Sequence, residues 1–228
     1  MSAPRILVIE HESDSGAAML GERAVQRGFV LDLATPGRGI PRSAAGYQMV
    51  LPMGAAPNVN DDHIQPWFHD EVALLQDADR RGIPVFGVCF GAQALAVALG
   101  GSVARAPQPE IGWYDVQSTR PHLISCGPWF QWHVDAITPP AGAEILATTE
   151  TCVQAYVIGK HLAVQFHPEV TENEIGQWAA AEPGTLSRLG IDVAAMLSET
   201  RDRLCGARER AYKLFDDFLR HAGLTGGC

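Results

Sequence analysis

Residues 83–99, IPVFGVCFGAQALAVAL, decide what kind of fold the chain forms. The first six, Ile83–Val88, have the length and apolar character of a buried strand. The last nine, Gly91–Leu99, have the alanine and leucine composition of a helix. Cys89 lies at the turn between them, with a glycine two residues to either side. A strand that turns directly into a helix is typical of an α/β sheet.

The chain before this stretch alternates in the same way. The run RILVIE at 5–10 is continuously apolar in its centre, as expected for a strand buried on both faces. Short connections between alternating strands and helices predict a mainly parallel sheet with helices on both faces. The expected strands are Arg5–Glu10, Phe29–Ala34 and Tyr47–Met53, and the expected helices are Ser15–Arg27 and Pro66–Gly82.

After residue 103 the pattern changes to strand-like runs separated by Pro- and Gly-rich turns. The expected strands are Ile111–Ser118, Phe130–Ile137, Glu144–Thr149, Gln154–Ile158 and Leu162–Phe166, followed by helices over Ile175–Ala181 and Ile191–Ala222. No linker is long enough to divide the chain. We therefore expect a three-layer α/β fold with a strand-rich second half, formed by one domain over 1–228. Residues 171–228 would be its C-terminal helical extension.

Composition excludes several classes of protein. The 228 residues are 46% hydrophobic and 19% charged, as in ordinary globular proteins. The net charge of −9 argues against electrostatic binding to nucleic acid or to an anionic membrane. No apolar run is long enough for a membrane span, and the N-terminus lacks the features of a signal peptide. Five cysteines without a C-x-x-C pair predict reduced thiols and a cytoplasmic protein rather than a zinc site or disulfide framework.

Cys89 is a candidate nucleophile because of the turn on which it lies. A sharp strand-to-helix turn lifts one side chain above the sheet, and flanking glycines prevent collisions with the neighbouring backbone. The sulfur would also lie at the N-terminus of the following helix, where free N–H groups and the helix dipole favour the thiolate. The alternative is a small buried cysteine that only fills the core.

His167 is the candidate partner because it ends an apolar strand and is followed by Pro168 and Glu169. In an extended chain, residues two apart point to the same side, so Glu169 would reach one imidazole nitrogen while the other faces the sulfur. Pro168 biases His167 toward the extended conformation. The alternative is a strand end with a solvated acid.

These segments resemble the class I, triad-type glutamine amidotransferases. The resemblance rests on VFGVCFGAQ at 85–93, AVQFHPEV at 163–170, WHVD at 132–135 and MGAAPNVND at 53–61. It is closest to stand-alone members related to the glutaminase half of GMP synthetase. It implies a flavodoxin-like fold and hydrolysis of the glutamine side-chain amide through a cysteinyl thioester.

The resemblance also implies roles for particular residues. Cys89, His167 and Glu169 would be the catalytic triad, and the backbone amides of Phe90 and Ala55 would form the oxyanion hole. Ala55 stands where the family usually has a glycine. It is tolerated if its φ is negative, but would distort the hole if φ had to be positive. The remaining matched positions, which would bind substrate, are Gln93, Gly54, His133 and Asp135.

Motifs for a second activity are missing. The sequence has no G-x-x-x-x-G-K-[ST] loop and no S-G-G-x-D-S loop, so nothing in it would activate an acceptor for amination. We therefore expect no cofactor and no metal. Either a separate synthase subunit receives the ammonia, or the substrate is itself a γ-glutamyl peptide or conjugate. A third possibility is a catalytically weak regulatory binding protein on the same scaffold.

Overall fold

The computed structural model describes residues 3–12 and 16–224, and its first half is a parallel sheet. Three strands pair in parallel in the order β2-β1-β3, and a parallel bridge between Val50 and Val85 leads on to β4. The elements of this half are β1 (Arg5–Ile9), α1 (Ala18–Gln26), β2 (Val30–Ala34), the 3-10 turns Pro36–Arg38 and Asp62–Ile64, β3 (Met49–Pro52), α2 (Gln65–Arg81), β4 (Phe86–Val88) and α3 (Phe90–Ala98).

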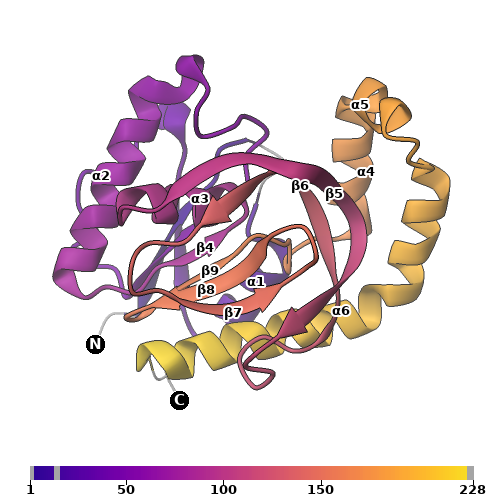
Figure 1. Ribbon diagram of the computed structural model, residues 1–228. Coiled ribbons are helices and arrows are strands. Elements are labelled where there is room, and N and C mark those ends of the chain that lie inside the picture. Colours follow the sequence, from indigo (N-terminus) through magenta and orange to yellow (C-terminus); the bar gives the residue numbers. More distant parts are fainter. Residues whose placement is uncertain (1–2, 13–15, 225–228) are drawn as a thin grey trace.

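The second half continues the sheet and adds a long two-stranded ribbon. The strand order is β4-β9-β8-β7-β5-β6, in which β4 and β9 are parallel and the later pairs are antiparallel. Figure 1 shows β5 and β6 arching over the rest of this sheet. The elements are β5 (Ser102–Ser118), β6 (Gly127–Thr138), β7 (Glu144–Thr148), β8 (Val153–Ile158), β9 (His161–Val164), α4 (Glu172–Ala181), α5 (Pro183–Arg188) and α6 (Val193–Ala222).

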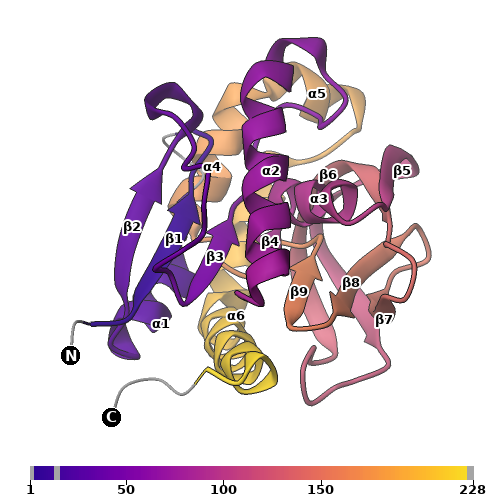
Figure 2. The same cartoon turned by 90° about the vertical axis from the view of Figure 1, so that its left-hand side faces the viewer.

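Helices cover both faces of the parallel strands. In β1, Ile6 and Val8 pack against α1 and α6 in one apolar cluster, whereas Leu7 and Ile9 pack against α2 and α3 in another. This alternation follows from the two-residue period of a strand, and it makes both faces of the sheet apolar. Figure 2 shows α2 in front of the strands. The expected three-layer α/β arrangement is confirmed.

Several element boundaries differ from the sequence prediction, and two of them have a clear physical reason. Strand β5 begins at Ser102 rather than Ile111, because its first part also pairs with β6. The sequence pattern does not reveal this first part, because it contains Pro107 and Pro109 and a break in the pairing register. Strand β9 ends at Val164 rather than Phe166, because the chain then bends and the His167 amide bonds to the Phe130 carbonyl. Helix α5 was not predicted. The proposed start of the first helix at Ser15, and Cys228, lie outside the described residues.

Helix α6 is long enough to cross a bilayer but is heavily charged. No helix in the described part of the chain combines the length and apolarity of a membrane span.

Candidate active site

Cys89 occupies a strained turn between β4 and α3. Its φ is +50° and its ψ is −107°, a conformation that non-glycine residues rarely adopt. The Cys89 amide donates to the Val164 carbonyl at 2.8 Å, and the Cys89 carbonyl accepts from the Gln93 amide at 3.0 Å. Backbone strain that is maintained by surrounding hydrogen bonds is typical of functional sites. The geometry is that of a nucleophile elbow.

Three glycines allow the chain to close around this turn. A Cβ on Gly87 would lie 2.6 Å from the Gly91 carbonyl oxygen, and a Cβ on Gly91 would lie 2.1 Å from the Pro52 carbonyl oxygen. A Cβ on Gly54 would lie 3.0 Å from Cε1 of His167 and 3.9 Å from Cβ of Cys89. The bare backbone of Gly54 therefore borders both the cysteine and the histidine.

His167 and Glu169 lie beside the elbow, beyond the end of β9. Nδ1 of His167 is 2.8 Å from Oε1 of Glu169, and both side chains are 4% exposed. The ring of Trp178 packs against the imidazole with 4.8 Å between ring centroids. Glu169 is thus hydrogen-bonded to one ring nitrogen of His167, as the spacing of the two residues suggested. The two residues do not lie in a strand, however, but in a bent segment that follows β9.

The charges around His167 favour its protonated form. Burial alone would lower the pKa of His167, but the charge of Cys89, the charge of Glu169 and hydrogen bonds to both raise that pKa well above its ordinary value. The arrangement can therefore hold an imidazolium at His167 in a buried site.

The Cys89 sulfur has two further contacts. Nε2 of Gln165 lies 3.5 Å from Sγ, and Sγ lies 3.9 Å from the Trp132 carbonyl oxygen. Gln165 also accepts a hydrogen bond from Gln93 at 3.2 Å. Sequence reasoning missed Gln165, although the residue lies two places before His167 in the quoted AVQFHPEV segment. The amide of Gln165 links Gln93 to the sulfur.

Phe90 and Ala55, whose amides the resemblance assigns to an oxyanion hole, come from different elements. Phe90 is the first residue of α3, and Ala55 follows the end of β3; both line the same pocket as Cys89. Ala55 is not among the described residues with positive φ, so its methyl group causes no backbone strain. The alanine is therefore compatible with the backbone conformation that the loop adopts here.

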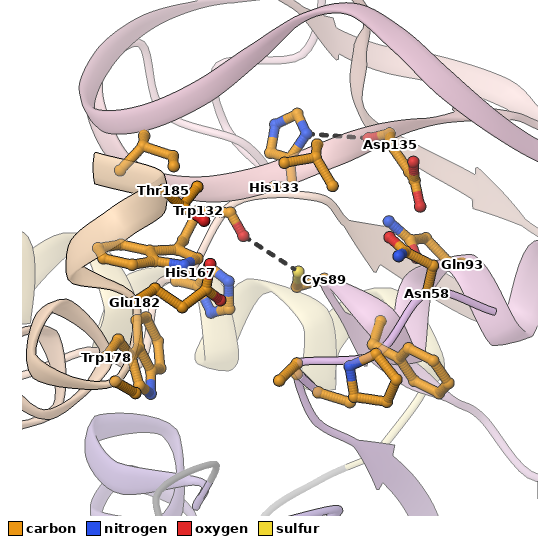
Figure 3. A pocket seen from close by; sticks show the side chains of 18 of the residues that line it. Asn58, Cys89, Gln93, Trp132, His133, Asp135, His167, Trp178, Glu182 and Thr185 are labelled. Carbon is orange, nitrogen blue, oxygen red and sulfur yellow. Dashed lines mark hydrogen bonds between the residues drawn. The ribbon is translucent and has the colours of Figure 1, made fainter. Parts of the chain in front are cut away.

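The other matched residues also line the pocket. Gln93 is 5% exposed and, instead of facing solvent, contacts Gln165. Nδ1 of His133 is 2.9 Å from the Asp135 carbonyl oxygen, and the Asp135 carboxylate lies 3.7 Å from Arg105. Burial raises the pKa of Asp135, and Arg105 opposes that shift. The structure therefore brings these residues to the pocket that contains Cys89, and Figure 3 shows Gln93 and Asp135 on the same side of the cysteine.

A second buried cluster lies behind His133. Single ligand atoms of Glu110, His133 and Cys152 all lie within 4.8 Å of one another, a grouping that sequence spacing did not indicate. Gln154 donates to Glu110 at 2.7 Å, and Nε2 of His133 lies 3.1 Å from the same carboxylate. Burial and Glu110 raise the pKa of the Cys152 thiol to about 12, so the thiol stays protonated. A metal would need a deprotonated thiol, whereas the Cys152 thiol is protonated and the Glu110 carboxylate is already bonded to Gln154 and His133. The cluster therefore fits a hydrogen-bond network better than a metal site.

The pocket around Cys89 has a volume of about 500 Å³, within the usual range for small-molecule sites. Figure 3 shows Gln93, Asn58 and Asp135 on one side of Cys89, and Trp178, Glu182 and Thr185 on the other. The residues on the Trp178 side of the pocket come from α4, α5 and the junction between them, and sequence analysis did not connect these helices with the site. No motif marks these helices, so their role is visible only in the structure.

Comparison with known proteins identifies the family. The model of the glutamine amidotransferase class-I family matches residues 55–180, more than half of the chain. A glutamine amidotransferase of Thermotoga maritima is similar in structure, with a TM-score of 0.86 and 25% identity, covering 96% of this chain and 99% of that one. A glutamine amidotransferase of Methylobacillus flagellatus shares the fold, with a TM-score of 0.88, 24% identity and 96% of each chain covered.

Curated relatives match over part of their length. GMP synthase [glutamine-hydrolyzing] of Limosilactobacillus reuteri is 34% identical over 150 residues, 61% of this chain and 25% of that protein. The enzyme of the same name from Aliivibrio fischeri is 36% identical over 104 residues, 42% of this chain and 20% of that protein. The chain thus matches a quarter or less of the length of these relatives. On the family model and its extent, the chain belongs to the class I glutamine amidotransferases.

Proposed function

We propose that the protein hydrolyses the side-chain amide of glutamine to glutamate and ammonia, with Cys89 as nucleophile. The observation that carries this proposal is the placement of Cys89 on a strained turn beside His167, which is bonded to Glu169. Family membership supports the same reaction. No cofactor is needed for it.

The reaction divides into two steps. The Cys89 thiolate attacks the amide carbon, and the electrons of the C=O bond move to the oxygen, where the Phe90 and Ala55 amides stabilise the charge. Collapse breaks the C–N bond, and His167 gives its proton to the departing nitrogen, which leaves as ammonia. Neutral His167 then takes a proton from water as the oxygen attacks the thioester. Release of the thiolate completes the cycle, with Glu169 supporting the imidazolium.

The direct test is ammonia release from glutamine together with labelling by an electrophilic glutamine analogue, located by mass spectrometry. We expect turnover and a covalent adduct on the peptide that contains Cys89. Turnover with the adduct on one of the other cysteines would overturn the assignment of the nucleophile. Absence of both turnover and adduct would favour the regulatory binding protein.

Replacing Glu169 by glutamine is expected to shift the pH dependence of the reaction. Glu169 raises the pKa of His167, so without its charge the imidazolium loses its proton at lower pH. The alkaline limb of kcat/KM should move to lower pH, and kcat should fall by about 10²-fold. Ammonia release measured across the pH range checks this. Glu172→Gln, at an exposed acid on α4, is the matched control, and an alkaline limb unchanged in Glu169→Gln would contradict the prediction.

A second substrate class is favoured by the wall that α4 and α5 add to the pocket. Ammonia as a leaving group needs no such wall, whereas a larger amine would contact Trp178, Thr185 and Arg188. A γ-glutamyl peptide or conjugate would use the Gln93 and Asp135 side for its glutamyl part and this wall for its amine. Comparison of kcat/KM for glutamine and for γ-glutamyl amides with aromatic amines distinguishes the two. A strong preference for glutamine would exclude the conjugate.

If glutamine is the substrate, we propose that the ammonia passes to a separate synthase subunit. The relatives named GMP synthase [glutamine-hydrolyzing] are four to five times longer than the matched region. Co-purification with the full chain tests for such a companion, and faster ammonia release on addition of the captured protein would support it. Loss of glutaminase activity on its addition would count against it.

A further inference from the structure

A buried ion pair lies behind the candidate oxyanion loop and takes no part in the proposed proton transfers. Nε2 of His11 is 2.8 Å from Oε2 of Glu71, and the two side chains are 1% and 0% exposed. His11 follows the end of β1, and Glu71 lies on the inner side of α2. A charged pair that is fully removed from water is costly to keep unless it has a structural or functional role.

The other nitrogen of His11 contacts the backbone of the loop itself. Nδ1 of His11 is 3.0 Å from the carbonyl oxygen of Gly54. The Gly54–Ala55 peptide is trans, as are the other peptide bonds in the described ranges. In a trans peptide the C=O and the following N–H point to opposite sides. A carbonyl directed at His11 therefore turns the Ala55 N–H away from His11.

The ring of His11 is held in place by more than the two hydrogen bonds. It packs edge-to-face against Phe90 with 4.8 Å between centroids and lies 5.4 Å from the Trp67 ring. Burial alone would lower the pKa of His11, but the charge of Glu71 and the bonds to Glu71 and Gly54 raise it overall. A protonated ring donates from both nitrogens, which matches its two acceptors.

We propose that His11, braced by Glu71, is a positioning residue that fixes the Gly54–Ala55 peptide so that the Ala55 N–H faces the Cys89 side of the pocket. The inference rests on the proposed function, because it assigns the Ala55 amide to the oxyanion hole. Such a donor must be oriented before charge develops, since reorientation during the reaction would forfeit its benefit. The pair acts through the backbone and touches neither substrate nor sulfur.

The test is His11→Phe, which keeps a ring against Phe90 and removes the donor to Gly54. We expect kcat for ammonia release to fall by about 10²-fold with KM little changed, because the oxyanion exists only after attack. Alkylation of Cys89 by iodoacetamide forms no oxyanion, so its rate should stay close to that of the wild type. His69→Phe, at an exposed position on the same helix as Glu71, is the matched control and should leave both rates unchanged.

His11→Phe leaves Glu71 as an unpaired buried charge, so the single variant is at risk of unfolding. The double variant His11→Phe with Glu71→Leu removes both charges and separates stability from positioning. We expect it to fold and still to show the low kcat. A double variant that folds with kcat close to that of the wild type would overturn the proposal.

A crystal structure of the double variant gives an answer that does not depend on glutaminase activity. We expect the Gly54 carbonyl to turn from its present direction. An unchanged carbonyl would overturn the positioning role even if the wild type hydrolysed no glutamine. Wild type without activity, combined with a turned carbonyl, would refute the proposed function but not the positioning role.

Discussion

Cys89→Ala is expected to lower kcat for ammonia release by about 10⁵- to 10⁶-fold. The proposed thioester cannot form without the sulfur, and only binding and the amide donors then remain to act on the substrate. Alanine keeps the Cβ at φ +50°, so the turn is no more strained than before. The variant should therefore fold and still bind glutamine. Ammonia release under single-turnover and steady-state conditions measures the loss.

The control is Cys205→Ala, which removes an exposed cysteine on α6 and should leave kcat unchanged. Cys89→Ser adds a further comparison, because it keeps a hydrogen-bonding atom at the same place but one that ionises far less readily than a thiol. We expect Cys89→Ser also to lose most activity. Cys89→Ala with at least a tenth of the wild-type kcat would show that another group attacks the amide.

The sequence was most informative where one residue type had a single physical explanation. The glycines at 87 and 91 predicted a crowded turn around Cys89, and the structure places backbone atoms where their side chains would lie. The spacing of His167 and Glu169 suggested the contact between them, which is 2.8 Å long. Continuous apolar runs likewise predicted the parallel strands, because a strand that is covered by helices on both faces needs apolar side chains on both.

The parts that the sequence did not predict depend on contacts between distant segments. His11 and Glu71 are 60 residues apart, and neither lies in a motif. Trp178 reaches the site because α4 packs beside β6, which no local pattern reports. Helix α5 is six residues long, too short for a helical period to become visible. Such features follow from tertiary packing and require coordinates.

Gly91→Ala is expected to prevent stable folding, with a loss in the free energy of unfolding of at least about 4 kcal/mol. The new Cβ would lie 2.1 Å from the carbonyl oxygen of Pro52 and 2.5 Å from its carbon, both backbone atoms of the buried strand β3. A flexible side chain could move aside, but β3 is paired with β1 and cannot. Urea denaturation and soluble yield measure the effect.

Gly176→Ala is the matched control, because that glycine lies inside α4 and nothing lies within 4 Å of its added Cβ. It should stabilise the protein by about 0.5–1 kcal/mol through helix propensity. Equal urea midpoints for Gly91→Ala and the wild type would show that α3 and β3 can separate at little cost.

The contact between α3 and β3 matters for the proposed catalysis as well as for stability. Gly91 donates its amide to the Met53 carbonyl at 3.0 Å, so the start of α3 is bonded to the end of β3. Phe90 precedes this contact on one side, and Gly54 and Ala55 follow it on the other. The residues that carry the two proposed oxyanion donors therefore lie close together, because Gly91 has no side chain and lets helix and strand touch. A variant that folded with α3 displaced from β3 would lose turnover even with the triad intact.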